Sequence, residues 1–270
     1  MPAAVHSRRA FLGGCAACLS LALVQPAQAE GEAVPPIGFR ELAPGVWLHT
    51  TWGQYNGGYV PANGLALVGP DDVLMIDTGW TPTQTAILLE KLAEIAPNRP
   101  VNLVVTHAHL DRVAGLALIH ARGGWSMARD ATVKAVEAQG WGTIQRSWSG
   151  ESTTLTAGGQ KVELFYPGPA HTRDNIVAFL PESAILFGGC MVRSVERPSP
   201  ANAVYANTLG SLSDADVCSW PQSIEAVIAR YGKAAKIVVP GHGEVGDADL
   251  LAQTLRLAKA EAAKSCHPAG

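Results

Sequence analysis

The sequence predicts an α/β fold in which two β-sheets face each other and helices lie outside them. Short apolar runs that are typical of buried strands recur along the chain, for example at residues 73–76 and 101–105. Segments with apolar residues at helical spacing follow such runs, and this alternation occurs in both halves of the chain. Because every sheet must bury an apolar face, strand clusters flanked by helices favour two packed sheets covered by helices.

Length and composition set limits on the class of protein. The chain has 270 residues, 47% of them hydrophobic, which is enough for a sizeable core. We expect one domain over residues 30–270, and we expect it to be a monomer. The net charge is −3 and no basic block stands out, so electrostatics give no support for nucleic-acid binding. After residue 30 no apolar run is long enough to span a membrane.

The first 29 residues are typical of an export signal. Arg8 and Arg9 precede a mildly apolar stretch at residues 11–24, and the small-residue triplet at 27–29 resembles a cleavage site. We therefore expect export to the periplasm. The paired arginines resemble a twin-arginine signal, and an ordinary secretory signal is the alternative. A lipidation box ending at Cys15 is disfavoured, because most of the apolar stretch follows that cysteine.

Cleavage would leave three cysteines, Cys190, Cys218 and Cys266. An odd number in an exported protein leaves at least one thiol unpaired. A fold held together by disulfides is not indicated for a chain of this length and apolar content.

Turn and cap residues delimit the expected elements. The Asn-Gly-Gly sequence at residues 56–58 predicts a hairpin turn, and residues 69–72 predict a turn between strands at 64–68 and 73–76. Thr81 is the expected N-cap of a helix that begins at Pro82. The other expected elements are strands at 125–128, 161–166, 175–180, 184–187 and 236–239, helices at 113–121, 131–139, 217–231 and 248–264, and an irregular stretch at 140–159.

Aromatic residues gather around the expected hairpin at residues 56–58. Trp52, Tyr55 and Tyr59 flank its glycines, as in a mobile flap that closes over a substrate. An ordinary surface hairpin explains the pattern equally well. Trp80, which follows the strand at 73–76, is a further candidate for substrate binding.

Two histidines and an aspartate follow the strand at residues 101–105. His107, His109 and Asp111 are separated by single residues, so in an extended segment their side chains point the same way. Neutral imidazole and carboxylate groups are preferred ligands of zinc. The alternative, a polar loop with accidental histidines, requires this spacing to arise by chance.

Three more potential ligands also follow expected strands. His171, Cys190 and His242 each come after one and have glycines nearby, which suits tight turns. Loops at one edge of a strand scaffold can converge on a common site. For Cys190 the alternative role is that of a small buried apolar side chain.

Four separated motifs together resemble a known family. They are His-x-His-x-Asp-Arg at 107–112, Gly-Pro-Ala-His-Thr-x-Asp-Asn at 168–175, Phe-Gly-Gly-Cys at 187–190 and Pro-Gly-His-Gly-Glu-Val-Gly-Asp at 240–247. In this order they resemble a class B (metallo-) β-lactamase of the first subclass, from Leu48 to the last helix. The resemblance implies an αββα sandwich and hydrolysis of β-lactam antibiotics: penicillins, cephalosporins and carbapenems.

The resemblance also implies the roles of individual residues. His107, His109 and His171 match the ligands of one zinc ion, and Asp111, Cys190 and His242 match those of a second. A zinc-bound hydroxide would attack the lactam carbonyl, and Asp111 would help to orient it. Arg193 stands where the family commonly has a lysine that pairs with the antibiotic carboxylate. It could instead be a surface arginine. Ser211 stands where asparagine is frequent, and we assign it no catalytic role.

Two other functions remain open from the sequence. One is a thiolester or lactone hydrolase of the same superfold, and the other is a zinc-binding protein without enzymatic activity. Hydrolases of the glyoxalase type carry histidine at the position of Arg112 and a bridging aspartate at that of Cys190. Guanidinium stays protonated and cannot bind zinc, so these two residues favour the lactamase.

Overall fold

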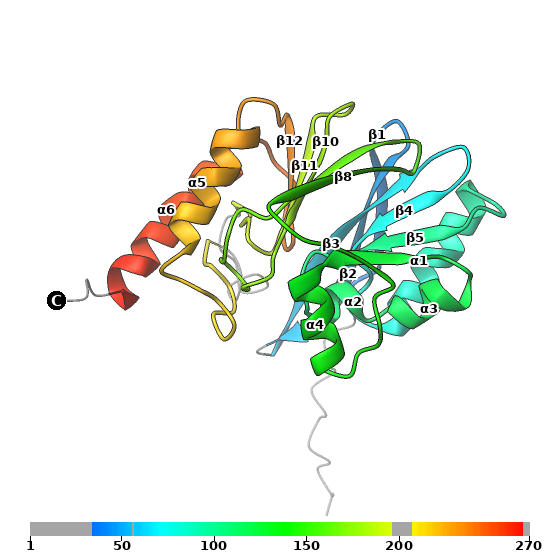
Figure 1. Ribbon diagram of the computed structural model, residues 1–270, viewed down its shortest axis with the longest axis horizontal. Coiled ribbons are helices and arrows are strands. Elements are labelled where there is room, and N and C mark those ends of the chain that lie inside the picture. Colours follow the sequence, from blue (N-terminus) through cyan, green and yellow to red (C-terminus); the bar gives the residue numbers. More distant parts are fainter. Residues whose placement is uncertain (1–33, 56, 196–206, 267–270) are drawn as a thin grey trace, which may run out of the picture. The chain divides into compact units, whose positions relative to one another are not determined.

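The computed structural model of the protein describes residues 34–55, 57–195 and 207–266 (Figure 1). The predicted export signal, with Cys15, lies outside these residues. In the first sheet the strands are β1 (Gly38–Ala43), β2 (Val46–Tyr55), β3 (Gly58–Val68), β4 (Val73–Ile76), β5 (Val101–Val104), β6 (Ser126–Arg129) and β7 (Arg146–Trp148). In the second they are β8 (Ser152–Ala157), β9 (Gln160–Phe165), β10 (Val177–Leu180), β11 (Ile185–Gly189) and β12 (Ile237–Pro240).

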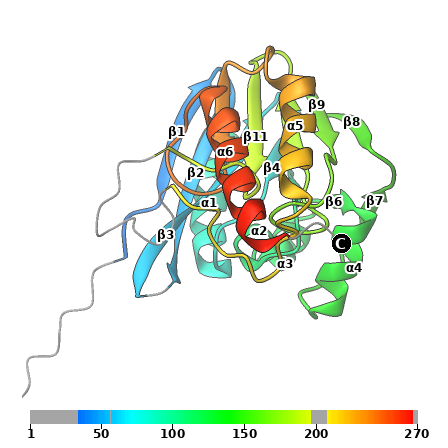
Figure 2. The ribbon, with the colours of Figure 1, turned by 90° about the vertical axis from the view of Figure 1, so that its left-hand side faces the viewer.

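Helices cover the outer faces of both sheets (Figures 1 and 2). They are α1 (Pro82–Ile95), α2 (Leu110–Val113), α3 (Leu116–Ala121), α4 (Asp130–Ala138), α5 (Trp220–Tyr231) and α6 (Asp249–Ser265). Helices α1 to α4 belong to the first sheet, and α5 and α6 pack on the second.

Three apolar clusters fill the spaces between these layers. Strand β4 contributes to two of them, because Leu74 and Ile76 face the second sheet whereas Val73 and Met75 face α1 and α3. Strands buried on both faces are mostly apolar rather than alternating, and this explains why the sequence shows β4, and β5 apart from Asn102, as short apolar runs. The third cluster joins the second sheet to α5 and α6. The predicted αββα sandwich is confirmed.

Strand direction brings several loops to one edge. In the first sheet β4 and β5 run parallel, so the chain leaves both at the same end. In the second sheet β11 and β12 are parallel, and β9 has the same direction because it and β11 are both antiparallel to β10. The loops after β5, β9, β11 and β12 carry the histidine, aspartate and cysteine candidates.

The details of several elements depart from the sequence predictions. The N-cap at Thr81 is confirmed, since its hydroxyl accepts the Gln84 N–H at 3.2 Å. The helix expected at 113–121 is interrupted at Gly115, where a Cβ atom would lie 2.3 Å from a Thr85 methyl on α1. The irregular stretch expected at 140–159 is wrong, because β7 and β8 lie there. Strand β8 is rich in serine and threonine and pairs with β9, so no apolar run revealed it.

Cys218 and Cys266 form a disulfide that the sequence did not predict. Their Cα atoms are 5.8 Å apart, although 48 residues separate them in the chain. Cys190 is the cysteine left free in the described part of the chain, and this agrees with the expectation of at least one unpaired thiol. Within the same residues, no helix is both long and apolar enough to cross a membrane.

Candidate metal centre

The candidate ligands meet at a cleft where loops of the two sheets converge. The cleft has a volume of about 280 Å³. Its lining side chains are Tyr55, Val60, Trp80, His109, Leu110, Asp111, His171, Arg193, Ser211, Ser213, Asp214 and His242. Two groups of potential ligands lie there: the histidine group (His107, His109 and His171) and the cysteine group (Asp111, Cys190 and His242).

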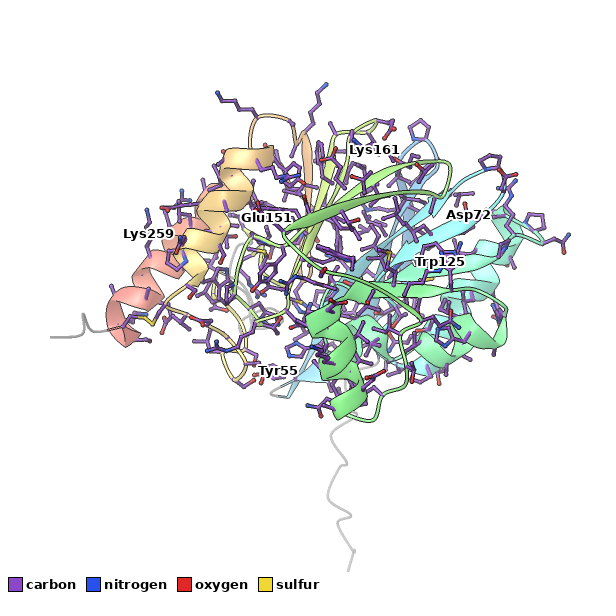
Figure 3. All side chains as sticks on the ribbon, viewed as in Figure 1. Tyr55, Asp72, Trp125, Glu151, Lys161 and Lys259 are labelled. Atoms are coloured by element: carbon purple, nitrogen blue, oxygen red, sulfur yellow. A yellow bond between two sulfur atoms is a disulfide. The ribbon has the colours of Figure 1, made fainter. Side chains whose placement is uncertain are left out.

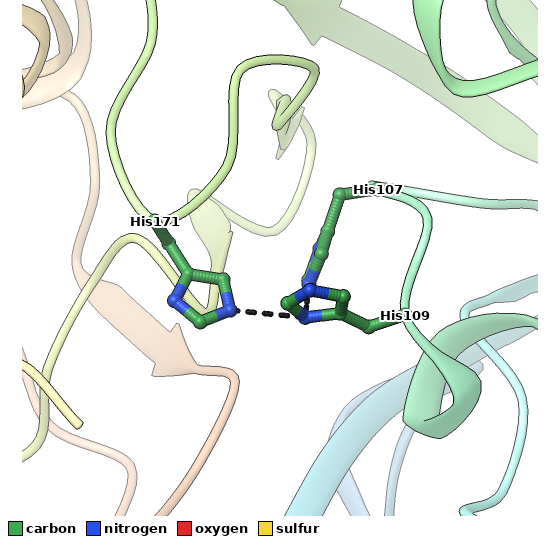
Figure 4. A group of neighbouring side chains, drawn as sticks. All are labelled: His107, His109 and His171. Carbon is green, nitrogen blue, oxygen red and sulfur yellow. Dashed lines mark hydrogen bonds between the residues drawn. The ribbon is translucent and has the colours of Figure 1, made fainter. Parts of the chain in front are cut away.

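In the histidine group, three ring nitrogens point at one another (Figure 4). Nδ1 of His109 lies 3.1 Å from Nε2 of His107 and 3.2 Å from Nε2 of His171. Burial lowers the pKa of His107 and His171 well below the usual value, so both rings are neutral at pH 7. One proton cannot satisfy three converging nitrogens, whereas one cation can, so this group fits a zinc ion.

Polar contacts fix the orientation of these rings. The Thr106 hydroxyl lies 3.2 Å from Nδ1 of His107, and an Asp214 carboxylate oxygen lies 3.1 Å from Nε2 of His109. The carboxylate of Asp174 accepts the N–H of Ala108, between the two histidines, at 2.9 Å. Partners of this kind set the tautomer of a ligand histidine and hold its ring in place.

In the cysteine group, three different donor atoms converge. The thiol sulfur of Cys190 lies 3.1 Å from Nε2 of His242, which lies 3.5 Å from a carboxylate oxygen of Asp111. Burial lowers the pKa of His242 to about 3 and raises that of the Cys190 thiol to about 12. A thiol this hard to ionise becomes a ligand when a metal replaces its proton, and a sulfur–nitrogen–oxygen donor set suits zinc.

Arg112 is fully buried behind the cysteine group. Its guanidinium donates hydrogen bonds to the Asp111 carboxylate at 2.6 Å, the Cys190 sulfur at 2.9 Å and the Gly241 carbonyl at 3.1 Å. Although burial acts in the opposite direction, this neighbouring cation lowers the pKa of Asp111. The Asp111 side chain therefore carries a negative charge at pH 7, as a metal ligand requires.

Close backbone contact brings His242 to Cys190. The N–H of Gly241 donates to the Gly189 carbonyl at 2.7 Å, and a Cβ atom on Gly241 would lie 2.6 Å from the Cys190 nitrogen. Nδ1 of His242 lies 2.6 Å from the Pro61 carbonyl, so this nitrogen carries the hydrogen. Nε2 is left as the atom that faces Cys190.

The predicted substrate-binding residues divide between two faces of one hairpin. Side chains alternate along β2 and β3, which places Tyr55 and Val60 on the cleft side and Trp52 on the other. The indole N–H of Trp52 donates to the Pro36 carbonyl, and the Tyr59 hydroxyl accepts from the side-chain amide of Gln54. Among the described residues that line the cleft, neither Trp52 nor Tyr59 appears.

Trp80 and Arg193, two more of the predicted substrate-binding residues, line the cleft. The Trp80 ring lies 5.9 Å from that of His242 and packs over Gly53, where any Cβ would overlap it. Arg193 lines the cleft although only 2% of it is exposed, and its Nε donates to the Thr208 carbonyl at 2.9 Å. Arg193 is thus not a surface arginine. Arg197, another cation near the motif, lies outside the described residues.

Sequence reasoning missed the residues that support the ligands. Asp77 accepts the N–H and the hydroxyl of Thr106, both at 2.8 Å, and its position directly after a buried strand was the available signal. Asp174 lies within the motif around His171. No sequence pattern pointed to Asp214 or Trp220, because only the folding of the chain brings these residues to the site.

Comparison with known proteins gives the family. Residues 57–242 match the model of the metallo-beta-lactamase superfamily. A metallo-beta-lactamase type 2 from Bacillus cereus is 38% identical over 83% of this chain and 83% of its own, and one from Pseudomonas aeruginosa is 34% identical over 84% of this chain and 86% of its own. The solved structure of a metallo-beta-lactamase from Pontibacter korlensis superposes with a TM-score of 0.75 at 35% identity, covering 83% of this chain and 99% of that one.

These matches cover most of the described residues, and both groups lie in loops of the matched fold. The chain therefore belongs to the metallo-β-lactamase superfamily, and its histidine and Asp–Cys–His groups are those of the first subclass of the class B enzymes.

Proposed function

We propose that this protein hydrolyses the amide bond of β-lactam antibiotics with two zinc ions. The histidine group would hold one ion, and Asp111, Cys190 and His242 would hold the other. The observation that carries the proposal is the convergence of two complete donor groups on one cleft. Penicillins, cephalosporins and carbapenems are the proposed substrates; the relatives are named metallo-beta-lactamases, which supports β-lactams as the class.

The chain's own residues prepare the reaction. When bound, zinc supplies a nucleophile at neutral pH and stabilises negative charge on the carbonyl oxygen. The buried histidines stay neutral, so their nitrogens are available as ligands without losing a proton. Asp111 lines the cleft, where its carboxylate can accept a hydrogen bond from the attacking water and orient it.

Arg193 is the proposed partner of the antibiotic carboxylate. Replacing it with alanine should lower kcat/KM by about one to two powers of ten, because a charged hydrogen bond contributes about 1.5–3 kcal/mol. The loss should appear mainly in KM, since the pair forms with substrate and transition state alike. Lysine at this position should restore part of the activity. Unchanged KM in the alanine variant, or loss of zinc from it, would exclude this role.

Tyr55 and Tyr59 form a matched pair for testing the flap. Tyr55 lines the cleft and is 41% exposed, whereas Tyr59 is on the other face of the same hairpin. Tyr55→Ala should raise KM roughly two- to tenfold for antibiotics with bulky apolar substituents, because aromatic contacts are lost. Tyr59→Ala should leave KM unchanged. Equal effects of the two substitutions would favour an ordinary hairpin.

A chromogenic cephalosporin, assayed with and without a chelator, tests the proposed function. We expect hydrolysis that the chelator abolishes and added zinc restores. A thiolester and a lactone should be poor substrates under the same conditions. Zinc binding without hydrolysis of any β-lactam would overturn the proposal.

We also propose that residues 1–29 direct export to the periplasm and that the remaining domain acts as a monomer. The Cys218–Cys266 disulfide supports export, because disulfides persist in oxidising compartments. Mass spectrometry of the periplasmic protein should find Glu30 at its N-terminus. A full-length cytoplasmic protein would contradict export, and a larger mass in sedimentation would contradict the monomer.

A further inference from the structure

Trp220, the first residue of α5, touches the loops that carry both ligand groups. Its indole N–H donates to the carbonyl of Met191, the residue directly after Cys190, at 3.0 Å. Its ring meets that of His171 edge to face, with centroids 6.0 Å apart. The Trp220 side chain is fully buried, so no water competes for either contact.

Helix α5 and the segment before it also form hydrogen bonds with the loop that carries His171. The Ser223 hydroxyl donates to the Pro169 carbonyl at 2.7 Å, and the N–H of Asp216 donates to the Ala170 carbonyl at 2.8 Å. These contacts fix the two residues that precede His171. Trp220 therefore stands on a segment whose position relative to the histidine group is already set.

Helix α6 also contacts the loop that carries Cys190, through a different hydrogen bond. The Thr254 hydroxyl, fully buried, accepts the backbone N–H of Arg193 at 2.8 Å and donates to the Leu250 carbonyl in its own helix. Residues 190–193 are thus anchored to α5 through Trp220 and to α6 through Thr254.

A covalent link joins the two anchoring helices. Cys218 lies two residues before Trp220, and Cys266 directly follows α6, so the disulfide ties the start of α5 to the end of α6. The helices lie side by side in Figure 2. Lys259 of α6, which Figure 3 labels, forms an ion pair with Glu225 of α5 at 2.7 Å. We call Trp220, Thr254 and this disulfide the α5–α6 clamp.

We propose that Trp220 is a positioning residue for both metal groups and that the disulfide holds it in place. The inference rests on the proposed zinc centre. Zinc tolerates small errors in ligand placement poorly, so residues that support ligand loops affect affinity without touching the metal. Trp220 acts on the cysteine group through its N–H and on the histidine group through its ring.

Two substitutions separate these actions. Trp220→Phe keeps an aromatic ring beside His171 and removes the N–H that anchors Met191. It should weaken zinc binding to the cysteine group about fivefold, the value of one ordinary hydrogen bond, and leave the histidine group unchanged. Trp220→Leu removes both the hydrogen bond and the ring contact, and it should weaken zinc binding to both groups. Chelator competition gives the two affinities, and the thiolate-to-metal absorption of the cobalt protein reports on Cys190 alone.

Trp148 supplies the control. It is buried in another apolar cluster, and its indole N–H has no hydrogen-bond partner among the described residues. Trp148→Phe should leave both zinc affinities and the cobalt spectrum unchanged. If Trp148→Phe weakens zinc binding to the cysteine group as much as Trp220→Phe does, Trp220 is only a core residue and the inference is overturned.

A second measurement needs no metal. Cys190 is 1% exposed, and its alkylation by iodoacetamide in the metal-free protein can be followed on the tryptic peptide 174–193, which contains no other cysteine. We expect Trp220→Phe, and also the double variant Cys218→Ser/Cys266→Ser, to raise this rate about fivefold or more. An unchanged rate in Trp220→Phe would overturn the positioning role, and one in the double variant would overturn the part assigned to the disulfide.

These results are distinguishable from failure of the proposed function. If the wild-type protein binds no zinc, the metal centre itself is wrong. If the wild type binds two ions and Trp220→Phe binds both with the same affinities, only the clamp is wrong.

Discussion

Replacing His171 with alanine is expected to lower kcat/KM by at least about a hundredfold and to remove one zinc ion. Substitutions of outer-shell partners typically cost about 10–100-fold in affinity or activity, so loss of a direct ligand should cost at least as much. Two nitrogens would remain in the histidine group, and among the described residues no other histidine, cysteine or carboxylate joins that group. Metal analysis and steady-state kinetics measure both effects.

His120 is the matched control for this prediction. It is a histidine of α3 whose Nε2 lies 2.8 Å from the Ser126 hydroxyl, and it does not line the cleft. His120→Ala should keep two zinc ions and nearly full activity. A His171→Ala protein that retains both would show that the histidine group is not a zinc site.

Replacing Arg112 with methionine should lower the free energy of unfolding of the metal-free protein by about 3–5 kcal/mol. Arg112 is buried against Asp77 at 3.5 Å and Asp111 at 2.6 Å, and methionine would leave both carboxylates without their cation. Urea unfolding gives the value. The metal-free form is needed, because a cation bound beside Asp111 would replace part of the lost charge.

Two further variants test whether charge causes this loss. Adding Asp77→Asn to Arg112→Met should recover part of the stability, because one uncompensated carboxylate disappears. Arg173→Met should cost at most about 1 kcal/mol, since Arg173 is exposed and its ion pair with Asp216 is at the surface. If the double variant is no more stable than Arg112→Met, lost packing rather than charge is responsible.

The fold and the ligand positions could be predicted because both depend on local patterns. Strands buried on two faces are mostly apolar, and a ligand just after such a strand lies at one end of the sheet whatever the rest of the chain does. His107, Cys190 and His242 follow this rule. Their convergence on one cleft follows from strand direction, which the resemblance implied and the structure shows.

The supporting residues could not be predicted in the same way. Trp220 reaches Met191, and Asp214 reaches His109, across large separations in sequence, and no local pattern encodes these contacts. The disulfide could not be predicted either, because Cys218 and Cys266 meet only when helices α5 and α6 pack antiparallel to each other. The polar strand β8 was missed because hydrogen bonding to β9, rather than an apolar run, defines it.

Strand alternation in the hairpin of β2 and β3 decides which of its aromatic side chains face the cleft. Trp52 and Tyr55 are three residues apart on β2, so alternation places them on opposite faces. Tyr59 pairs with Gln54 and therefore shares its face rather than that of Tyr55. Substrate binding by Trp52 and Tyr59 was predicted from the sequence, but both lie on the face of the hairpin away from Tyr55 and Val60, which line the cleft. A raised KM in Tyr59→Ala, against the unchanged KM expected above, would support a binding role for Tyr59.

The position of bound zinc is the most direct test of the account. Crystals grown with zinc should be measured on both sides of the zinc absorption edge, and the anomalous difference density located. We expect two peaks, one among the ring nitrogens of His107, His109 and His171 and one among Asp111, Cys190 and His242. A fully active protein with no peak at the cysteine group, or with its zinc outside both groups, would contradict this expectation.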